Sequence, residues 1–217
     1  MSKTEELNDW AHGQKCQKAV DALTKNGFTA VYCRSSEEAF HYIVNEAEGA
    51  HSVGFGGSLS IADLKLTDKL KSMGKEILNH GAPGLTPEER LEITYREPSC
   101  DLFLTSTNAL TLSGTLVNID GHGNRAAAMF FGPKKVIIVA GRNKLVAGGT
   151  DEALKRIREY AAPANAKRLQ LATPCAVTGF CSDCDSPQRI CRVTTIIDRK
   201  PRAADIRVLV VNEDMGL

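Results

Sequence analysis

Four cysteines near the C-terminal end of the sequence are, by type and spacing, the residues best suited to chemistry. Cys175, Cys181, Cys184 and Cys191 lie within seventeen residues in the pattern C-x5-C-x2-C-x6-C, and the other three cysteines are scattered through the chain. Four thiolates that converge on one point form the ligand set of a tetrahedral zinc ion or of an iron–sulfur cluster. Gly, Ser and Asp residues between the cysteines favour the turns that such convergence needs. We therefore expect a metal-binding insertion at about residues 173–192.

Two disulfides, or four thiols without a ligand, are the other uses of such a cluster. The total of seven Cys is odd, and the polar stretch Met1–Asp9 lacks the apolar segment of a secretory signal. We therefore expect a reducing compartment, the cytoplasm, where a metal site is the better use of the cysteines. Only Cys181 and Cys184 form a C-x2-C knuckle, and the ferredoxin pattern C-x2-C-x2-C-x3-C-P is absent. The spacing therefore leaves zinc and iron–sulfur both open.

The composition is that of an ordinary globular chain. Lys+Arg 27 against Asp+Glu 26 gives a net charge of +1, which offers no bulk electrostatic basis for binding nucleic acid or an anionic membrane. No apolar run approaches the roughly 20 residues that a membrane span needs. We expect neither a nucleic-acid partner nor a membrane span.

Apolar periodicity, capping residues and glycines predict alternating strands and helices. The expected helices cover residues 3–26, 35–48, 59–73, 86–97 and 150–160. The expected strands cover residues 28–33, 51–55, 76–79, 102–106, 114–120, 135–140, 193–197 and 206–211. The apolar run 136–139 is typical of a central strand covered on both faces. This alternation predicts a single α/β domain over residues 1–217 with a largely parallel sheet.

Glycines and small polar residues follow two of the expected strands. The first group is Gly54, Gly56, Gly57 and Ser58, where glycine would let backbone N–H groups approach an anionic ligand. A tight structural turn explains this group equally well. Neither a dinucleotide fingerprint nor a P-loop lysine is present.

A second polar group combines amides, hydroxyls, one acid and one arginine. Its members are Ser106, Asn108, Gly114, Thr115, Asn118, Asp120, Gly123, Asn124 and Arg125. Arg125 can form a bidentate pair with a carboxylate or phosphate group. The alternative is a β-hairpin that turns at residues 120–123, with Asn124 capping a following helix. Asp120 or His122 could do acid–base work, but no Ser/His/Asp or Cys/His arrangement identifies a catalytic residue.

The stretch from Asp101 to Val146, together with the earlier V-G-F-G-G-S, resembles the LUD domain, the lactate-utilisation protein family. The resemblance covers roughly residues 7–211, and the Cys-rich tail resembles one branch of the family. It implies a Rossmann-like three-layer α/β sandwich with a mostly parallel sheet, as in the ribose-5-phosphate isomerase, glucosamine-6-phosphate deaminase and CoA-transferase group. It also implies a ligand pocket between residues 54–58, 106–108 and 114–125. The CoA-transferase glutamate nucleophile has no counterpart here.

Family members act with iron–sulfur partners in oxidising lactate to pyruvate, which favours a [4Fe–4S] cluster at the four cysteines. The resulting hypothesis is an accessory or electron-transfer component in oxidation of lactate or a related hydroxy acid, with iron–sulfur oxidoreductase subunits as partners. The alternative is an enzyme or sensor that binds a small anionic metabolite, a phosphosugar or CoA ester, and carries a structural zinc. Whether the chain is an enzyme, and whether it forms a homo-oligomer, stay open.

Overall fold

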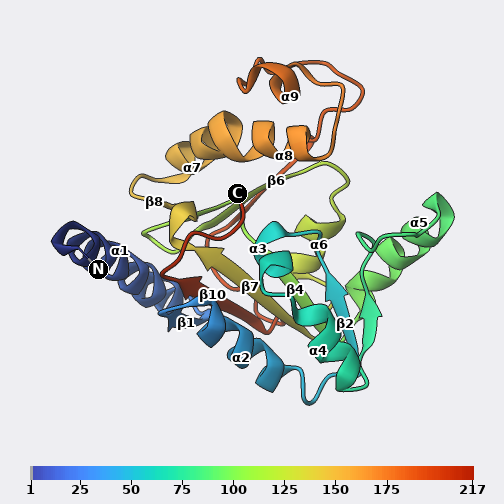
Figure 1. The fold of residues 1–217 in the computed structure, drawn as a ribbon, viewed down its shortest axis with the longest axis horizontal. Coiled ribbons are helices and arrows are strands. Elements are labelled where there is room, and N and C mark those ends of the chain that lie inside the picture. The colour runs from blue at the N-terminus through green and yellow to red at the C-terminus, as the bar shows by residue number, and fades with distance from the viewer. Residues whose placement is uncertain (1) are drawn as a thin grey trace.

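The computed structural model describes residues 2–217, and its central layer is a parallel sheet (Figure 1). Six strands run in the order β1-β10-β7-β4-β2-β3, with every neighbouring pair parallel. They are β1 (Thr29–Cys33), β2 (Ser52–Phe55), β3 (Glu76–Leu78), β4 (Leu102–Ser106), β7 (Lys135–Gly141) and β10 (Ile206–Val211). Helices flank the sheet, so the predicted three-layer α/β sandwich with a mostly parallel sheet is confirmed.

Strand β7 is central because its side chains are apolar on both faces. Val136 and Ile138 pack into one core, and Ile137 and Val139 pack into the other. All four are buried, as expected for a strand covered on both sides. The sheet therefore separates two apolar cores.

Each core is closed by its own helices. One contains buried residues of α1 (Lys3–Lys25) and α6 (Asn124–Phe130), and the other those of α2 (Ser36–Glu46), α3 (Leu59–Asp63) and α4 (Leu66–Ser72). Helix α5 (Pro87–Arg96) packs beside the edge strand β3 and begins with a capping box between Thr86 and Glu89. The short 3-10 helix η1 (Glu97–Ser99) follows it directly.

The expected helix over residues 59–73 is wrong as a single element. It divides into α3 and α4 at Leu64 and Lys65, and Lys65 adopts a left-handed φ of 51°. Leu64 and Leu66 are both buried, and the break turns both side chains into the core on this side of the sheet. Neither glycine nor proline marks this break in the sequence.

The first half of α1 projects beyond the sheet (Figure 1). Periodicity predicts that Leu7 and Trp10 share an apolar side with Ala19, Val20 and Leu23. The last three are buried, but Trp10 is 65% exposed and Leu7 is 54% exposed. Only the C-terminal half of α1 therefore contributes to the core.

A second, smaller sheet takes the strands expected at residues 114–120 and 193–197. Its order is β8-β5-β6-β9, with β6 antiparallel to both β5 and β9. The strands are β5 (Ala109–Thr111), β6 (Leu116–Asp120), β8 (Leu145–Val146) and β9 (Val193–Ile197). The mostly parallel sheet is therefore accompanied by a mixed second sheet that the sequence did not reveal, in which the chain reverses between β5 and β6 at Gly114.

The expected helix over residues 150–160 extends further than predicted. Helix α7 (Thr150–Arg156) continues through a π-helical segment, η3 (Ile157–Ala161), into α8 (Ala162–Arg168). These helices pack on the second sheet. The short helix α9 (Pro174–Thr178) and the Cys-rich tail lie beyond α8 (Figure 1).

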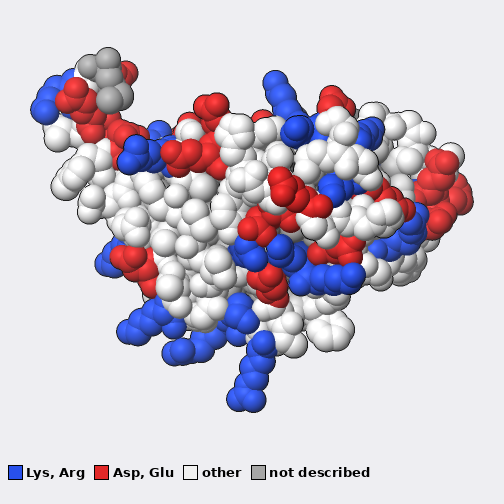
Figure 2. All heavy atoms as spheres, turned by 90° about the horizontal axis from the view of Figure 1, so that it is seen from below, with Lys and Arg blue, Asp and Glu red and all other residues white. Residues whose placement is uncertain are grey.

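Both signs of charge are distributed over the face seen in Figure 2, in keeping with the near-zero net charge. Within residues 2–217, no helix combines the length and apolarity that crossing a membrane requires.

Replacing Gly114 by alanine should destabilise the protein strongly. Gly114 has a φ of +82°, and an added Cβ would lie 2.8 Å from the backbone of Ala22 and Leu23 in α1. The combined strain and overlap should cost roughly 2–4 kcal/mol in the free energy of unfolding, measured by urea denaturation. The matched control is Gly49→Ala, since nothing lies within 4 Å of a Cβ there. Equal stability of the two variants would contradict this placement of the β5–β6 turn.

Candidate functional site

Polar groups gather just beyond the carboxyl ends of β2, β4 and β7. We call this side of the parallel sheet, where its strands end, the carboxyl edge, or simply this edge. Gly56–Ser58 follow β2, Ser106–Asn108 lie at the end of β4, and the 3-10 helix η2 (Arg142–Lys144) follows β7. In open parallel sheets, ligands bind beyond the carboxyl ends of the strands. The candidate site is therefore built from this edge.

The buried guanidinium of Arg125 organises the centre of this edge. Its Nε lies 3.2 Å from Asp120 Oδ2. Its other donors bond Ser106 O at 3.2 Å, Asn118 Oδ1 at 2.9 Å, Asn108 Oδ1 at 3.1 Å and Ile119 O at 3.0 Å. These contacts match the five N–H donors of arginine. An anionic ligand could bond Arg125 only by displacing one of these acceptors.

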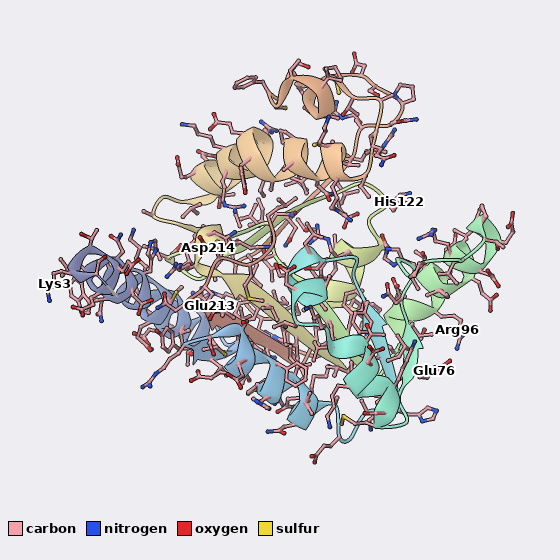
Figure 3. The ribbon with its side chains drawn as sticks, in the orientation of Figure 1. Lys3, Glu76, Arg96, His122, Glu213 and Asp214 are labelled. Carbon is pink, nitrogen blue, oxygen red and sulfur yellow. The ribbon has the colours of Figure 1, made fainter. Side chains whose placement is uncertain are left out.

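Asp120 also fixes the start of α6. Its Oδ1 accepts hydrogen bonds from the backbone N–H of His122 at 3.1 Å and of Gly123 at 2.8 Å, and its Oδ2 accepts one from Ala126 at 3.3 Å. The N-cap of α6 is Gly123, with a φ of 86°, so the alternative that Asn124 caps this helix is wrong. The turn leads into α6 and not into a hairpin, and it leaves His122 exposed on the loop (Figure 3).

Asn108, which follows β4, and Asn118 of β6 lie in two segments that reciprocal hydrogen bonds hold together. Asn118 Oδ1 accepts from the Asn108 backbone N–H at 3.0 Å, and Asn108 Oδ1 accepts from the Ile119 N–H at 3.0 Å. The buried Nδ2 of Asn118 has no partner among the described residues. A buried donor without a partner is costly, and it is a feature that a bound ligand or water can relieve.

Lys144 is the residue of this edge that the sequence did not reveal. It is only 4% exposed, and its Nζ donates to Ser106 Oγ at 2.8 Å. Burial is the main cause that lowers the pKa of Lys144 to about 7, the nearby Arg156 and Arg125 contribute to this shift, and Asp63 opposes it. Such a lysine exchanges a proton near neutral pH, which is a property of functional lysines. Its position in the short segment that follows the buried strand β7 was the available signal.

Not all the predicted ligand-binding residues meet at this edge. Gly114 packs against α1, and Thr115 Oγ1 donates to Asp198 at 3.1 Å. Gly54 is enclosed, because a Cβ there would lie 2.9 Å from Cys100 Sγ. A Cβ on Gly56 would lie 3.1 Å from Arg125 Cγ, so this glycine allows the loop to approach the arginine.

Gly57 and Ser58 instead border a separate cavity of about 270 Å³. Its other walls come from α3, α4, the loop after β3 and Arg168 at the end of α8. We call it the edge cavity. The predicted pocket is thus divided between the polar centre around Arg125 and this cavity.

The four cysteines of the tail are all free thiols, so the disulfide alternative is absent from the structure. Cys181 is exposed, and Cys175, Cys184 and Cys191 are partly buried. Burial raises the pKa of Cys191, and the thiols of Cys181, Cys175 and Cys184 raise it further. The thiols are therefore within electrostatic reach of Cys191. Within residues 2–217, however, no three His, Cys, Asp or Glu side chains are grouped so as to hold one metal ion.

Hydrogen bonds tie the C-terminal end of the tail to the rest of the fold and close its loop. The Arg192 N–H donates to Asp120 O at 3.1 Å, which anchors its C-terminal end beside the polar centre. Ser186 Oγ donates to Ala172 O at 2.9 Å, and the Ala172 N–H donates to Gln188 at 2.7 Å, which close the loop on itself. Gly179 and Asp183, with φ of 81° and 46°, supply turns between the cysteines.

The sequence matches the LUD domain family over residues 16–211, so the chain belongs to this family. Membership associates the chain with lactate utilisation. The fold is similar to that in the crystal structure of a DUF162 family protein from Deinococcus radiodurans, with a TM-score of 0.54. The two sequences are 17% identical, and the match covers 92% of this chain and 98% of that chain. No curated protein matched the sequence.

Replacing Lys144 by methionine should change how stability depends on pH. Below pH 7 the buried lysine is protonated in the folded and unfolded chains, and its burial penalty is fully present. Between about 7 and the ordinary value of 10.5, only the unfolded chain holds the proton, so wild-type stability rises with pH. The stability of wild type relative to Lys144→Met should rise by up to about 1.4 kcal/mol per pH unit in that interval.

Urea denaturation at several pH values measures this difference. Lys155→Met, at an exposed lysine of α7, is the control and should show no such slope. If the free energy of unfolding changed with pH by the same amount in wild type and Lys144→Met, the lowered pKa of Lys144 would be contradicted.

Proposed function

We propose that this LUD protein is an accessory or electron-transfer component in the oxidation of lactate or a related hydroxy acid, and that its Cys-rich tail holds a [4Fe–4S] cluster. Cys175, Cys181, Cys184 and Cys191 would be the ligands. The cluster would supply one-electron transfer, and iron–sulfur oxidoreductase subunits would be the partners. A reducing compartment such as the cytoplasm would keep these thiols available.

One observation carries this proposal: four unpaired thiols share one tail segment that is anchored to the LUD fold. Cys191 lies within electrostatic reach of the other three, and the loop is closed by side-chain hydrogen bonds at residues 172, 186 and 188. Thiolate is the ligand type that iron–sulfur clusters and structural zinc both use. The donor set therefore fits the group.

Closing the sulfurs around a metal requires movement only within the tail. Most residues between Val177 and Gln188 are exposed, so their backbone can shift without opening either core. Arg189 holds the loop locally, since it donates to Cys184 O at 2.6 Å and to Asp183 Oδ1 at 2.9 Å. Repulsion between thiolates, which opposes their approach without a metal, is relieved when a cation binds.

Metal analysis of protein purified without oxygen tests the proposal. We expect about four iron atoms and about four sulfides per chain, with visible absorption and a paramagnetic signal on reduction. Cys184→Ser should lose most of the iron, because one ligand is removed. The matched control is Ser182→Ala, which changes an exposed neighbour in the same loop and should keep the iron.

Two outcomes would count against this proposal. One zinc ion per chain with no iron would retain the thiolate site and remove the electron-transfer role. No metal in protein prepared without oxygen would remove both.

The buried Lys144 favours a second candidate, an enzyme or sensor for a small anionic metabolite such as a phosphosugar or CoA ester. Its ammonium group and Ser106 lie beside the Arg125 centre, and Asn118 offers an unused amide donor there. The metal of the tail would then be structural zinc.

Thermal unfolding in the presence of phosphosugars and CoA esters tests this second candidate. A binding metabolite should raise the melting temperature of wild type and of Lys155→Met, but not of Lys144→Met. Cys184→Ser should lower the melting temperature and leave the ligand-induced shift intact. Equal shifts in the Lys144 and Lys155 variants would exclude a role for Lys144 in binding.

A further inference from the structure

A histidine–glutamate pair lies beside the edge cavity and takes no part in the functions proposed above. His80 Nδ1 lies 2.6 Å from Glu97 Oε1, and the His80 backbone N–H donates to the same oxygen at 3.1 Å. Glu97 is only 1% exposed, and its Oε2 has no partner among the described residues. A buried carboxylate with an oxygen that accepts no hydrogen bond is costly in free energy. Such a group is often found where it has a functional role.

The fold fixes this pair through the contact between β3 and α5. His80 lies in the loop after β3, and Glu97 follows α5 in η1. An ion pair between Glu76 and Arg96 joins the two elements (Figure 3), and Arg90 of α5 donates to His80 O. The imidazole is therefore held by its backbone and by its ring.

The hydrogen bond to Glu97 sets the chemistry of the imidazole. A carboxylate can only accept, so Nδ1 carries the proton in the bond and Nε2 is left for another partner. Nε2 faces the glycine loop after β2, because a Cβ built on Gly57 would lie 3.2 Å from it. Gly57 lines the edge cavity, as do Asn79 and Gly81 on either side of His80 in the chain.

The lining of the edge cavity carries positive charge. Lys65, in its left-handed conformation at the α3–α4 break, and Arg168 of α8 both line it, together with the hydroxyls of Ser58 and Thr67. Within this lining, Lys65 and Arg168 are the ionisable residues. Such a lining favours an anion, and the volume of about 270 Å³ suits a small metabolite.

We propose that the edge cavity binds a small metabolite with an oxyanion, either carboxylate or phosphate, and a neighbouring hydroxyl or carbonyl oxygen. Lys65 and Arg168 bind the oxyanion, and His80, oriented by Glu97, forms a hydrogen bond with the neighbouring oxygen. His80 accepts from a hydroxyl in its neutral form and donates to a carbonyl when protonated. The site uses neither the Cys-rich tail nor Lys144. It deepens the second candidate function, because it assigns the small anionic metabolite to the edge cavity and names the residues that would bind it there.

Titration of the full chain with L-lactate, pyruvate, glycerol 3-phosphate and inorganic phosphate tests the site by calorimetry and by NMR of ¹⁵N-labelled histidine. We expect at least one probe to bind and to shift the Nε2 resonance of His80. Arg168→Gln should weaken binding about tenfold, and Arg158→Gln, an exposed arginine of η3, should leave it unchanged.

The probes distinguish the sources of the oxyanion. Binding of lactate or pyruvate alone assigns a carboxylate, and binding of glycerol 3-phosphate with inorganic phosphate assigns a phosphate. His80→Gln should weaken the binding of the organic probes and leave the binding of inorganic phosphate unchanged. Inorganic phosphate has no hydroxyl or carbonyl oxygen on a neighbouring carbon for His80 to bond. Either no binding by any probe at millimolar concentration, or binding that Arg168→Gln and His80→Gln both leave intact, would overturn the proposal. The metal content of the tail, measured on the same samples, reports separately on the electron-transfer function.

Discussion

The buried guanidinium of Arg125 is the interaction on which the arrangement of this protein depends. It bonds Ser106 of the parallel sheet together with Asn118 and Ile119 of the second sheet, and it pairs with Asp120. Burial disfavours a charge, so a guanidinium in this position needs all of its acceptors. These contacts therefore require the ends of β4 and β6 to stay together, which joins the two sheets at the edge where ligands bind in α/β folds.

The other candidate groups lie close to the same centre. Asp120 anchors α6 through its side chain and the Cys-rich tail through its carbonyl, so the tail is held beside the LUD core and not on a free linker. Lys144 bonds Ser106 at the same edge, and burial, with repulsion from Arg156 and Arg125, lowers its pKa. The edge cavity lies on the other side of the glycine loop, with Gly56 against Arg125 and Gly57 against His80. The Cys-rich tail, Lys144 and the edge cavity therefore all lie next to the segments that Arg125 and Asp120 hold together.

Local signals predicted much of this fold, and long-range contacts account for what they missed. The apolar run of β7 and the capping residues of α5 identify those elements in any context. Nothing local indicates that β6 pairs with β9, which is distant in sequence, or that the chain breaks at Lys65. The cysteines were evident from spacing alone, whereas Lys144 and the pair of His80 and Glu97 became candidates only through burial and contact. The sequence left open whether Arg125 binds an anion, and only the fold shows that acceptors of the protein surround its guanidinium.

The central claim is that the tail thiolates bind one inorganic centre while the LUD fold holds them in place. X-ray absorption spectroscopy of protein prepared without oxygen, at the iron and zinc edges, tests it most directly because it identifies the atoms bound to the metal. The account predicts an iron edge with sulfur ligands at about 2.3 Å and a second iron neighbour. A metal surrounded by oxygen or nitrogen atoms, or the absence of both edges, would contradict it.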